Sequence, residues 1–127
     1  MPYSKLKSAK VLIVDDEKDL RETLRTHLEL EEAVVTEATN GLEAYSLILK
    51  NKYDIILSDI RMPGCSGVEL LEKIRNSKIK TAPIVLMSAF TDISDERAKE
   101  IGARGMFLKP ENIITLKELL VDTLEGF

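Results

Sequence analysis

The chain has 127 residues, of which 44% are hydrophobic and 31% are charged, a composition that fits one ordinary globular domain. Its formal net charge of -4 argues against direct binding of nucleic acid, because such binding needs a basic surface that releases phosphate counterions. One cysteine and one histidine exclude an internal disulfide and a cysteine–histidine zinc site, and no stretch approaches the roughly 18 apolar residues of a membrane span.

Short apolar runs alternate with longer amphipathic stretches along the chain. The runs read VLIV, AVVTEA, YDIILS, PIVLMS and GMFLK, at residues 11–14, 33–38, 53–58, 83–88 and 105–109. They are nearly continuous in apolar residues rather than alternating with polar ones, which is typical of strands that are covered on both faces. We therefore predict five buried, parallel strands.

Between these runs, apolar residues recur at the spacing of an α-helix. The stripes are Leu20, Leu24 and Leu28; Leu42, Tyr45 and Leu49; Val68, Leu71 and Ile74; Ile93, Ala98 and Ile101; and Leu116, Leu119, Leu120 and Leu124. Gly102 is placed to end the fourth of these helices. The resulting order is (βα)5, which predicts an α/β fold: a doubly wound, parallel, five-stranded sheet with helices on both faces, in three αβα layers.

Polar residues stand where four of the predicted strands end. They are Asp15 and Asp16, then Asp59, Ser88 and Lys109. Because ligand sites in such sheets lie at the carboxyl ends of the strands, we expect these side chains to converge on one edge. Carboxylates suit Mg²⁺, for which Mn²⁺ could substitute, and a carboxylate can also attack phosphorus to form an aspartyl phosphate. The set indicates phosphoryl transfer, which needs mainly positioning and charge neutralisation.

Asp15 and Asp16 also fit a more ordinary role. Acids that directly precede a helix often cap its N-terminus or complement its dipole, and the stretch that carries Leu20 begins just after them. The presence of Asp59 and Lys109 at matching strand ends favours the metal-binding interpretation over capping alone.

Five motifs in chain order carry a resemblance to a known family. They read VLIVDD (11–16), ATNGLEA (38–44), SDIRMPGCSG (58–67), MSA (87–89) and GARGMFLKP (102–110). With these motifs the chain resembles a receiver domain of two-component response regulators over essentially its whole length. The resemblance implies a flavodoxin-like sheet with strand order 2-1-3-4-5. It also implies one domain over residues 1–127, with an N-terminal extension over 1–9 and the folded domain over about 10–125.

The resemblance implies a role for each acid. Asp59 would accept a phosphoryl group from the phosphohistidine of a sensor histidine kinase or phosphotransfer protein, and would later lose it by hydrolysis. Asp16, Asp59 and the backbone carbonyl of Arg61 would bind Mg²⁺ directly, and Asp15 would bind it through a water molecule. The protein would then be a regulatory phosphoacceptor that catalyses its own phosphorylation and dephosphorylation, rather than a conventional turnover enzyme.

Four further assignments come from the same resemblance. Ser88 matches the hydroxyl that moves toward the phosphoryl group, and Lys109 matches the lysine that pairs with it. Met106 stands where the family usually has a tyrosine or phenylalanine that swings inward as part of the switch, and methionine is flexible enough to swing as well. Arg61 lies two residues after the acceptor, where the family varies and tunes the lifetime of the phosphoryl group, although a solvated loop arginine fits this position equally well.

The expected setting is cytoplasmic signalling. The expected partners are the kinase or phosphotransfer protein and a downstream target or output domain, with no direct nucleic-acid binding and no membrane contact, and the protein could form a homodimer. The chain fits either a stand-alone receiver or part of a longer protein.

Two alternative functions stay open at this point. One is a phosphorylation-independent pseudo-receiver that acts only as an interaction surface. The other is a small Mg²⁺-dependent phosphohydrolase with an aspartate nucleophile. Such enzymes carry a DxDxT motif after the first strand, whereas residues 15–19 read DDEKD.

Overall fold

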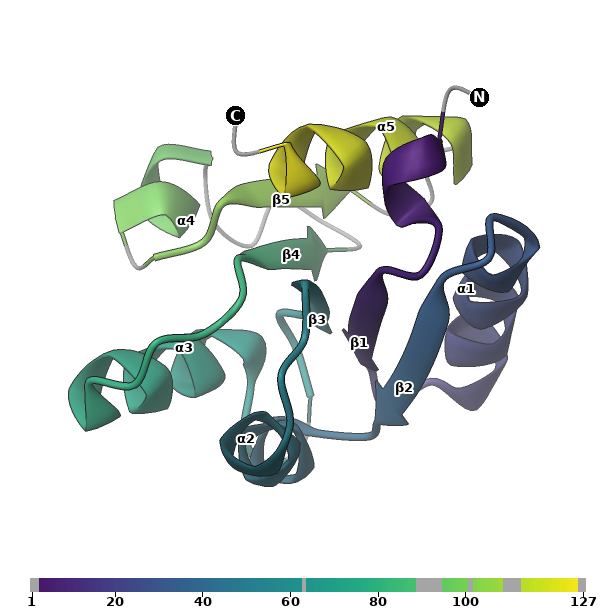
Figure 1. Cartoon of the computed structure of the whole chain (residues 1–127). Helices are drawn as coiled ribbons and strands as arrows, with labels where there is room; N and C mark the ends of the chain where they lie inside the picture. Colours follow the sequence, from purple (N-terminus) through teal and green to yellow (C-terminus); the bar gives the residue numbers. More distant parts are fainter. Residues whose placement is uncertain (1–2, 63, 89–94, 101, 109–112, 126–127) are drawn as a thin grey trace.

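The computed structural model describes residues 3–62, 64–88, 95–100, 102–108 and 113–125. The strands are β1 (Lys10–Val14), β2 (Val34–Ala38), β3 (Ile55–Asp59), β4 (Ile84–Ser88) and β5 (Gly105–Leu108). The helices are α1 (Lys18–Leu30), α2 (Gly41–Lys50), α3 (Gly67–Ser77), α4 (Asp95–Glu100) and α5 (Ile113–Leu124), preceded by a short 3₁₀-helix, η1 (Ser4–Leu6). All strand pairs are parallel and the order is β2-β1-β3-β4-β5 (Figure 1), so the predicted doubly wound sheet and its strand order are confirmed.

The sheet separates two hydrophobic cores, because successive side chains of a strand point to opposite faces. Leu12 and Val14 of β1 join the core beneath α2, α3 and α4, whereas Val11 and Ile13 join the core beneath α1 and α5. Figure 1 shows α2 and α3 on one side of the sheet and α1 and α5 on the other. Burial on both faces explains why the strands read as continuous apolar runs.

Helix starts and ends are set by local polar contacts. At the start of α3, the Ser66 hydroxyl accepts a hydrogen bond from the Glu69 amide and the Glu69 carboxylate accepts one from the Ser66 amide, each at 3.1 Å. The N-cap of α2 is Asn40, whose side-chain oxygen accepts from the Glu43 amide at 2.9 Å. Gly102 has a φ of 107° and its amide donates to the Lys99 carbonyl, as predicted for a glycine that follows a helix.

The N-terminal segment packs onto the α1 and α5 side of the sheet (Figure 1). Leu6 of η1 is fully buried in that core. Beside it, the Lys117 ammonium of α5 lies 2.7 Å from a carboxylate oxygen of Glu31 and 5.4 Å from the centre of the Tyr3 ring. These contacts join the chain's start to α5. Across the described ranges, no helix has the length and apolar character needed to cross a bilayer.

Candidate functional site

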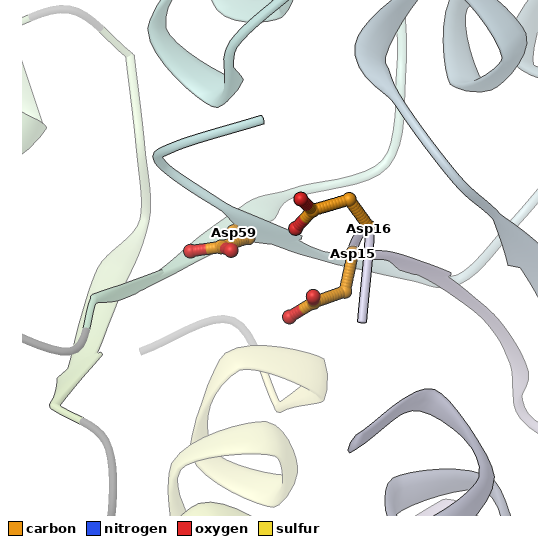
Figure 2. Close-up of side chains that lie close together, drawn as sticks. All are labelled: Asp15, Asp16 and Asp59. Carbon is orange, nitrogen blue, oxygen red and sulfur yellow. The ribbon is translucent and has the colours of Figure 1, made fainter. Parts of the chain in front are cut away.

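Three carboxylates meet at the carboxyl edge of the sheet. Asp15 directly follows β1 and Asp59 is the last residue of β3, and the two strands are neighbours whose pairing ends at Val14 and Ser58. Each of Asp15, Asp16 and Asp59 offers a carboxylate oxygen, and these oxygens all lie within 4.8 Å of one another (Figure 2). The structure therefore brings together the three acids whose convergence the sequence predicts.

The acids differ in exposure. Asp15 is fully buried, Asp59 is 7% exposed and Asp16 is exposed to solvent. Asp16 also lines an open cleft of about 520 Å³ together with Ile60, Arg61, Met62 and Ser66. One side of the acidic cluster is thus accessible to a ligand while the other is enclosed by protein.

The donor chemistry fits a hard divalent cation. Two carboxylates about 4 Å apart repel by about 1 kcal/mol in water and by about 4 kcal/mol at the effective dielectric constant of a protein surface. A dication at this edge would offset that repulsion, and Mg²⁺ is held in proteins by one or two carboxylates while it keeps several waters. The buried pair and the accessible Asp16 match that pattern.

The segment that follows Asp59 is held against the sheet by backbone contacts. The Ile60 amide donates to the Met87 carbonyl of β4, and the Gly67 amide donates to the Ile60 carbonyl at 2.9 Å. Gly67 comes so near that a β-carbon there would overlap the carbonyl oxygen of Asp59. Close approach of this kind requires glycine, so the residue fixes how α3 begins relative to the candidate acceptor.

The far side of this segment is held by α2. The Gly41 amide donates to the Cys65 carbonyl at 3.0 Å, and a β-carbon on Gly41 would lie 2.6 Å from the Cys65 sulfur. Burial raises the pKa of the Cys65 thiol, which disfavours the reactive thiolate at neutral pH. Cys65 therefore acts here as a packing residue.

The remaining predicted site residues take the following places. Ser88 is the last residue of β4 and is paired in register with Leu108 of β5. Met106 lies in β5 opposite Leu86 and is half-buried against the core of the α2 and α3 side. Arg61 is exposed and lines the same cleft as Asp16. Lys109 lies outside the described residues.

The cap interpretation of the acidic pair is wrong. The N-cap of α1 is Glu17, which makes no side-chain capping bond, and the acid in the first turn is Asp19. The Asp15 side chain instead bonds the backbone two residues further along, because its Oδ1 accepts a hydrogen bond from the Glu17 amide at 2.8 Å. The carboxylate is therefore kept at the sheet edge, next to Asp16 and Asp59.

Sequence reasoning missed three charged residues, Arg21, Glu37 and Arg25, whose hydrogen bonds lead to Asp15. Arg21 Nη1 donates to the Asp15 carbonyl oxygen at 2.8 Å, and Arg21 Nε donates to Glu37 Oε1 at 3.0 Å. The second oxygen of Glu37 accepts from Arg25 Nη1 at 2.8 Å. A signal was available, because an acid inside the mostly apolar run AVVTEA needs a cation near it once the strand is covered.

Glu37 makes stability depend on pH. Its hydrogen bonds with Arg25 and then Arg21 hold the pKa of its carboxyl below the usual range, against the opposing effect of burial. A lowered folded-state pKa adds stability above the unfolded pKa of about 4.3, and this stability is lost as the pH falls through the folded value. We expect Glu37→Gln to lower the free energy of unfolding by about 1 kcal/mol at pH 7, with the deficit shrinking below about pH 4.

Urea unfolding between pH 3 and pH 7, followed by far-UV circular dichroism, measures this deficit. The matched control is Glu22→Gln, which removes a carboxylate of α1 that is 58% exposed and lies 3.9 Å from Lys18; it should change stability little at any pH. A Glu37→Gln deficit that stays constant down to pH 3 would contradict the assignment.

Known proteins with similar sequences include response regulators. Residues 11–121 match the family model described as "Response regulator receiver domain". ResD of Bacillus subtilis, named as a transcriptional regulatory protein, is 37% identical over 116 residues, which cover 87% of this chain and 48% of ResD. SrrA of Staphylococcus aureus, named likewise, is 36% identical over 118 residues, which cover 89% of this chain and 48% of SrrA. The chain thus spans about half the length of these relatives.

Solved structures agree with the sequence matches. The response regulator TrrA from Thermotoga maritima, solved in complex with Mg²⁺-BeF, superposes with a TM-score of 0.81 at 34% identity, covering 91% of this chain and 98% of that one. A two-component response regulator from Clostridium difficile gives 0.84 at 34% identity, covering 93% and 97%. The family model spans most of the sequence, the fold agrees, and the acids lie where the motifs put them. The chain belongs to the receiver domain family of response regulators.

Proposed function

We propose that Asp59 is the phosphoacceptor of this receiver domain and that Mg²⁺ binds beside it. The observation that carries this proposal is the meeting of Asp15, Asp16 and Asp59 within 4.8 Å at the end of β1 and β3. An Asp59 carboxylate oxygen attacks the phosphorus of a phosphohistidine, and the phosphorus–nitrogen bond breaks. The imidazole, which carries a proton on its other ring nitrogen, leaves as a neutral group. Hydrolysis of the aspartyl phosphate by water returns the free carboxylate and releases inorganic phosphate.

The chain's own residues divide this work. Asp16, Asp59 and the Arg61 carbonyl would hold the cation directly and Asp15 would hold it through water. Bound Mg²⁺, or Mn²⁺ in its place, supplies charge neutralisation at the phosphoryl oxygens. The low exposure of Asp59 supports its role, because the protein around a carboxylate at the base of a site keeps water away from it on most sides.

The remaining roles rest on position. Ser88 at the end of β4 would hydrogen-bond a phosphoryl oxygen, and Lys109 would pair with the same group. Met106 would take the place of the switching aromatic residue. Arg61, which lines the cleft beside Asp16, would influence attack by water and so tune the lifetime of the phosphoryl group.

Intact-protein mass spectrometry tests the central claim. After incubation with a small acyl phosphate and Mg²⁺, the protein should gain the mass of one phosphoryl group, because the donor replaces the kinase and the chain supplies the catalytic groups. Asp59→Asn should gain none, and neither should the unchanged protein with excess chelator. Asp19→Asn, which removes an exposed acid in the first turn of α1, is the matched control and should be modified normally.

The proposal fails if the unchanged protein gains no phosphoryl group or if Asp59→Asn gains one. Followed over time after removal of the donor, the same measurement tests the role of Arg61. Loss of the phosphoryl group at an unchanged rate in Arg61→Ala would end the proposed role of Arg61. A partner-binding response to phosphorylation that is the same in Met106→Ala would end the proposed switch role of Met106.

The signalling context follows from this chemistry. A sensor histidine kinase or phosphotransfer protein would supply the phosphoryl group, in the cytoplasm, and a downstream target or output domain would respond to the shifted conformational equilibrium. The phosphohydrolase alternative is not favoured, because its DxDxT motif is missing and the family match is to receivers. The pseudo-receiver alternative is not favoured either, since the acidic cluster is assembled.

A further inference from the structure

We propose that Arg21 is a positioning residue that fixes the peptide between Asp15 and Asp16 and so prepares the acidic cluster for a divalent cation. The inference rests on the proposed function, because it concerns the same cation site. Its direct support is the hydrogen bond from Arg21 Nη1 to the Asp15 carbonyl oxygen, at 2.8 Å. Arg21 itself is not among the residues proposed to bind the cation.

Contacts with described residues hold Asp15 at three separate atoms. Its amide donates to the Ala38 carbonyl of β2 at 3.1 Å, its Oδ1 accepts from the Glu17 amide, and its carbonyl oxygen accepts from Arg21. A peptide carbonyl and the amide that follows it share one rigid plane. Holding the Asp15 oxygen therefore sets the direction in which the chain continues into Asp16.

The arginine that makes this contact is itself held in place. Its Nε donates to Glu37 Oε1, and its side chain is only 13% exposed. Glu37 lies on β2 in register with Ile13 of β1, so the anchor belongs to the sheet. Ordering a long arginine side chain costs up to about 2 kcal/mol of rotamer entropy. Because the Glu37 contact orders Arg21 when the protein folds, this entropy is lost during folding and not when a cation binds.

The arrangement uses two donors of one guanidinium. Nε contacts the sheet through Glu37 while Nη1 contacts the Asp15 carbonyl. A lysine ammonium is a single point charge on a flexible stem and lacks this fixed fork. The geometry therefore favours arginine over lysine, which makes the conservative variant informative.

Fixing the peptide matters because the acids repel. Oxygens of Asp15, Asp16 and Asp59 lie within 4.8 Å of one another, and Asp16, as the exposed member, is the one most able to move away into solvent. Without the contact from Arg21, the turn after β1 would relax and separate Asp16 from Asp59 in the metal-free protein. Part of the binding free energy of a cation would then be used to bring the acids back together, and its affinity would be lower.

The test compares three variants in a titration with Mg²⁺ alone, followed by amide chemical shifts in NMR spectra. We expect Arg21→Ala to weaken Mg²⁺ binding about ten-fold or more, the effect typical of residues that support metal ligands. Arg21→Lys should recover only part of this loss. Arg25→Ala is the matched control, because Arg25 also bonds Glu37 but has no described contact with Asp15; its affinity should stay within about two-fold of the unchanged protein.

A second readout needs no metal. Hydrogen exchange of the Glu17 amide, which donates to Asp15 Oδ1, should be faster in metal-free Arg21→Ala than in metal-free Arg25→Ala, because only the first variant frees the turn. Each variant loses an ionic contact to Glu37, but Arg21→Ala also loses the bond to the Asp15 carbonyl, from a side chain that is only 13% exposed. Its melting temperature should therefore fall further than that of Arg25→Ala. Both titrations are run well below the melting temperatures of the two variants, so that a difference in cation affinity is not an effect of general destabilisation.

The outcomes separate the two proposals. If the unchanged protein binds Mg²⁺ and Arg21→Ala binds it equally well, or if Arg25→Ala is weakened as much as Arg21→Ala, the positioning role is overturned and the proposed function stands. If the unchanged protein shows no Mg²⁺ binding, the proposed function is overturned and the positioning role falls with it.

Discussion

Asp16→Asn is expected to weaken Mg²⁺ binding by about 100-fold or more and to leave the metal-free protein at least as stable as before. The loss should exceed the 10- to 100-fold typical of residues that only support a ligand, because a proposed direct ligand is removed. The gain or constancy in stability has a separate cause. Asp16 lies within 4.8 Å of two other acids, and neutralising this exposed carboxylate removes at least the repulsion expected in water, about 1 kcal/mol for each.

Thermal unfolding with and without Mg²⁺ measures both effects in one experiment. Mg²⁺ at about 100 times its dissociation constant should stabilise the unchanged protein by about 2.7 kcal/mol. That increment should fall to about 0.4 kcal/mol or less in Asp16→Asn, while Asp19→Asn should keep it. An Asp16→Asn variant that retains the full increment would remove Asp16 from the cation site.

Gly67→Ala is expected to lower the free energy of unfolding by about 3 kcal/mol or more, at the upper end of the range for overpacking. The added β-carbon would overlap the Asp59 carbonyl oxygen and come 3.2 Å from the Ile60 α-carbon, so it meets backbone rather than an adaptable side chain. That backbone has little freedom to move, because Asp59 ends β3 and the Ile60 amide is bonded to β4.

Gly64→Ala in the same segment is the comparison variant. Gly64 has a φ of 84°, and a β-carbon there would meet nothing within 4 Å. Its cost comes from the left-handed backbone alone, about 1–2 kcal/mol. Denaturant unfolding of the two variants separates the causes, and a Gly67→Ala protein that is no less stable than Gly64→Ala would show that close approach to Asp59 does not constrain the fold.

The same substitution connects stability to the site. If Gly67→Ala folds, the overlap must be relieved by a shift of the start of α3 away from β3, of the Asp59 backbone, or of both, since the clash is with the Asp59 carbonyl group. Phosphorylation by a small acyl phosphate should then fall together with stability. This links a backbone contact to the chemistry through the position of one residue.

Much of the architecture could be predicted from local pattern. Burial on both faces leaves a run such as VLIV without polar residues, and the helices between the strands need one apolar stripe each. The acids could be placed together for a topological reason: parallel strands end at the same edge, so residues that follow β1 and β3 must lie near each other. For this reason the sequence alone predicts that Asp15, Asp16 and Asp59 lie together.

The contacts that the sequence did not predict depend on the register between strands and on the close approach of backbone segments. Arg21 meets Glu37 because β2 pairs with β1 so that Glu37 lies beside Ile13, and a shift of one residue would turn Glu37 to the other face of the sheet. The need for glycine at Gly67 depends on how near α3 begins to β3, which no spacing of apolar residues encodes.

The sequence by itself thus determined the elements, the fold class and the acids of the candidate site, since these follow from periodicity and from where strands end. The tertiary structure alone decided which side chains hold those acids in place. Contacts such as those of Arg21 and Gly67 arise between segments whose relative position is set only by packing and strand pairing.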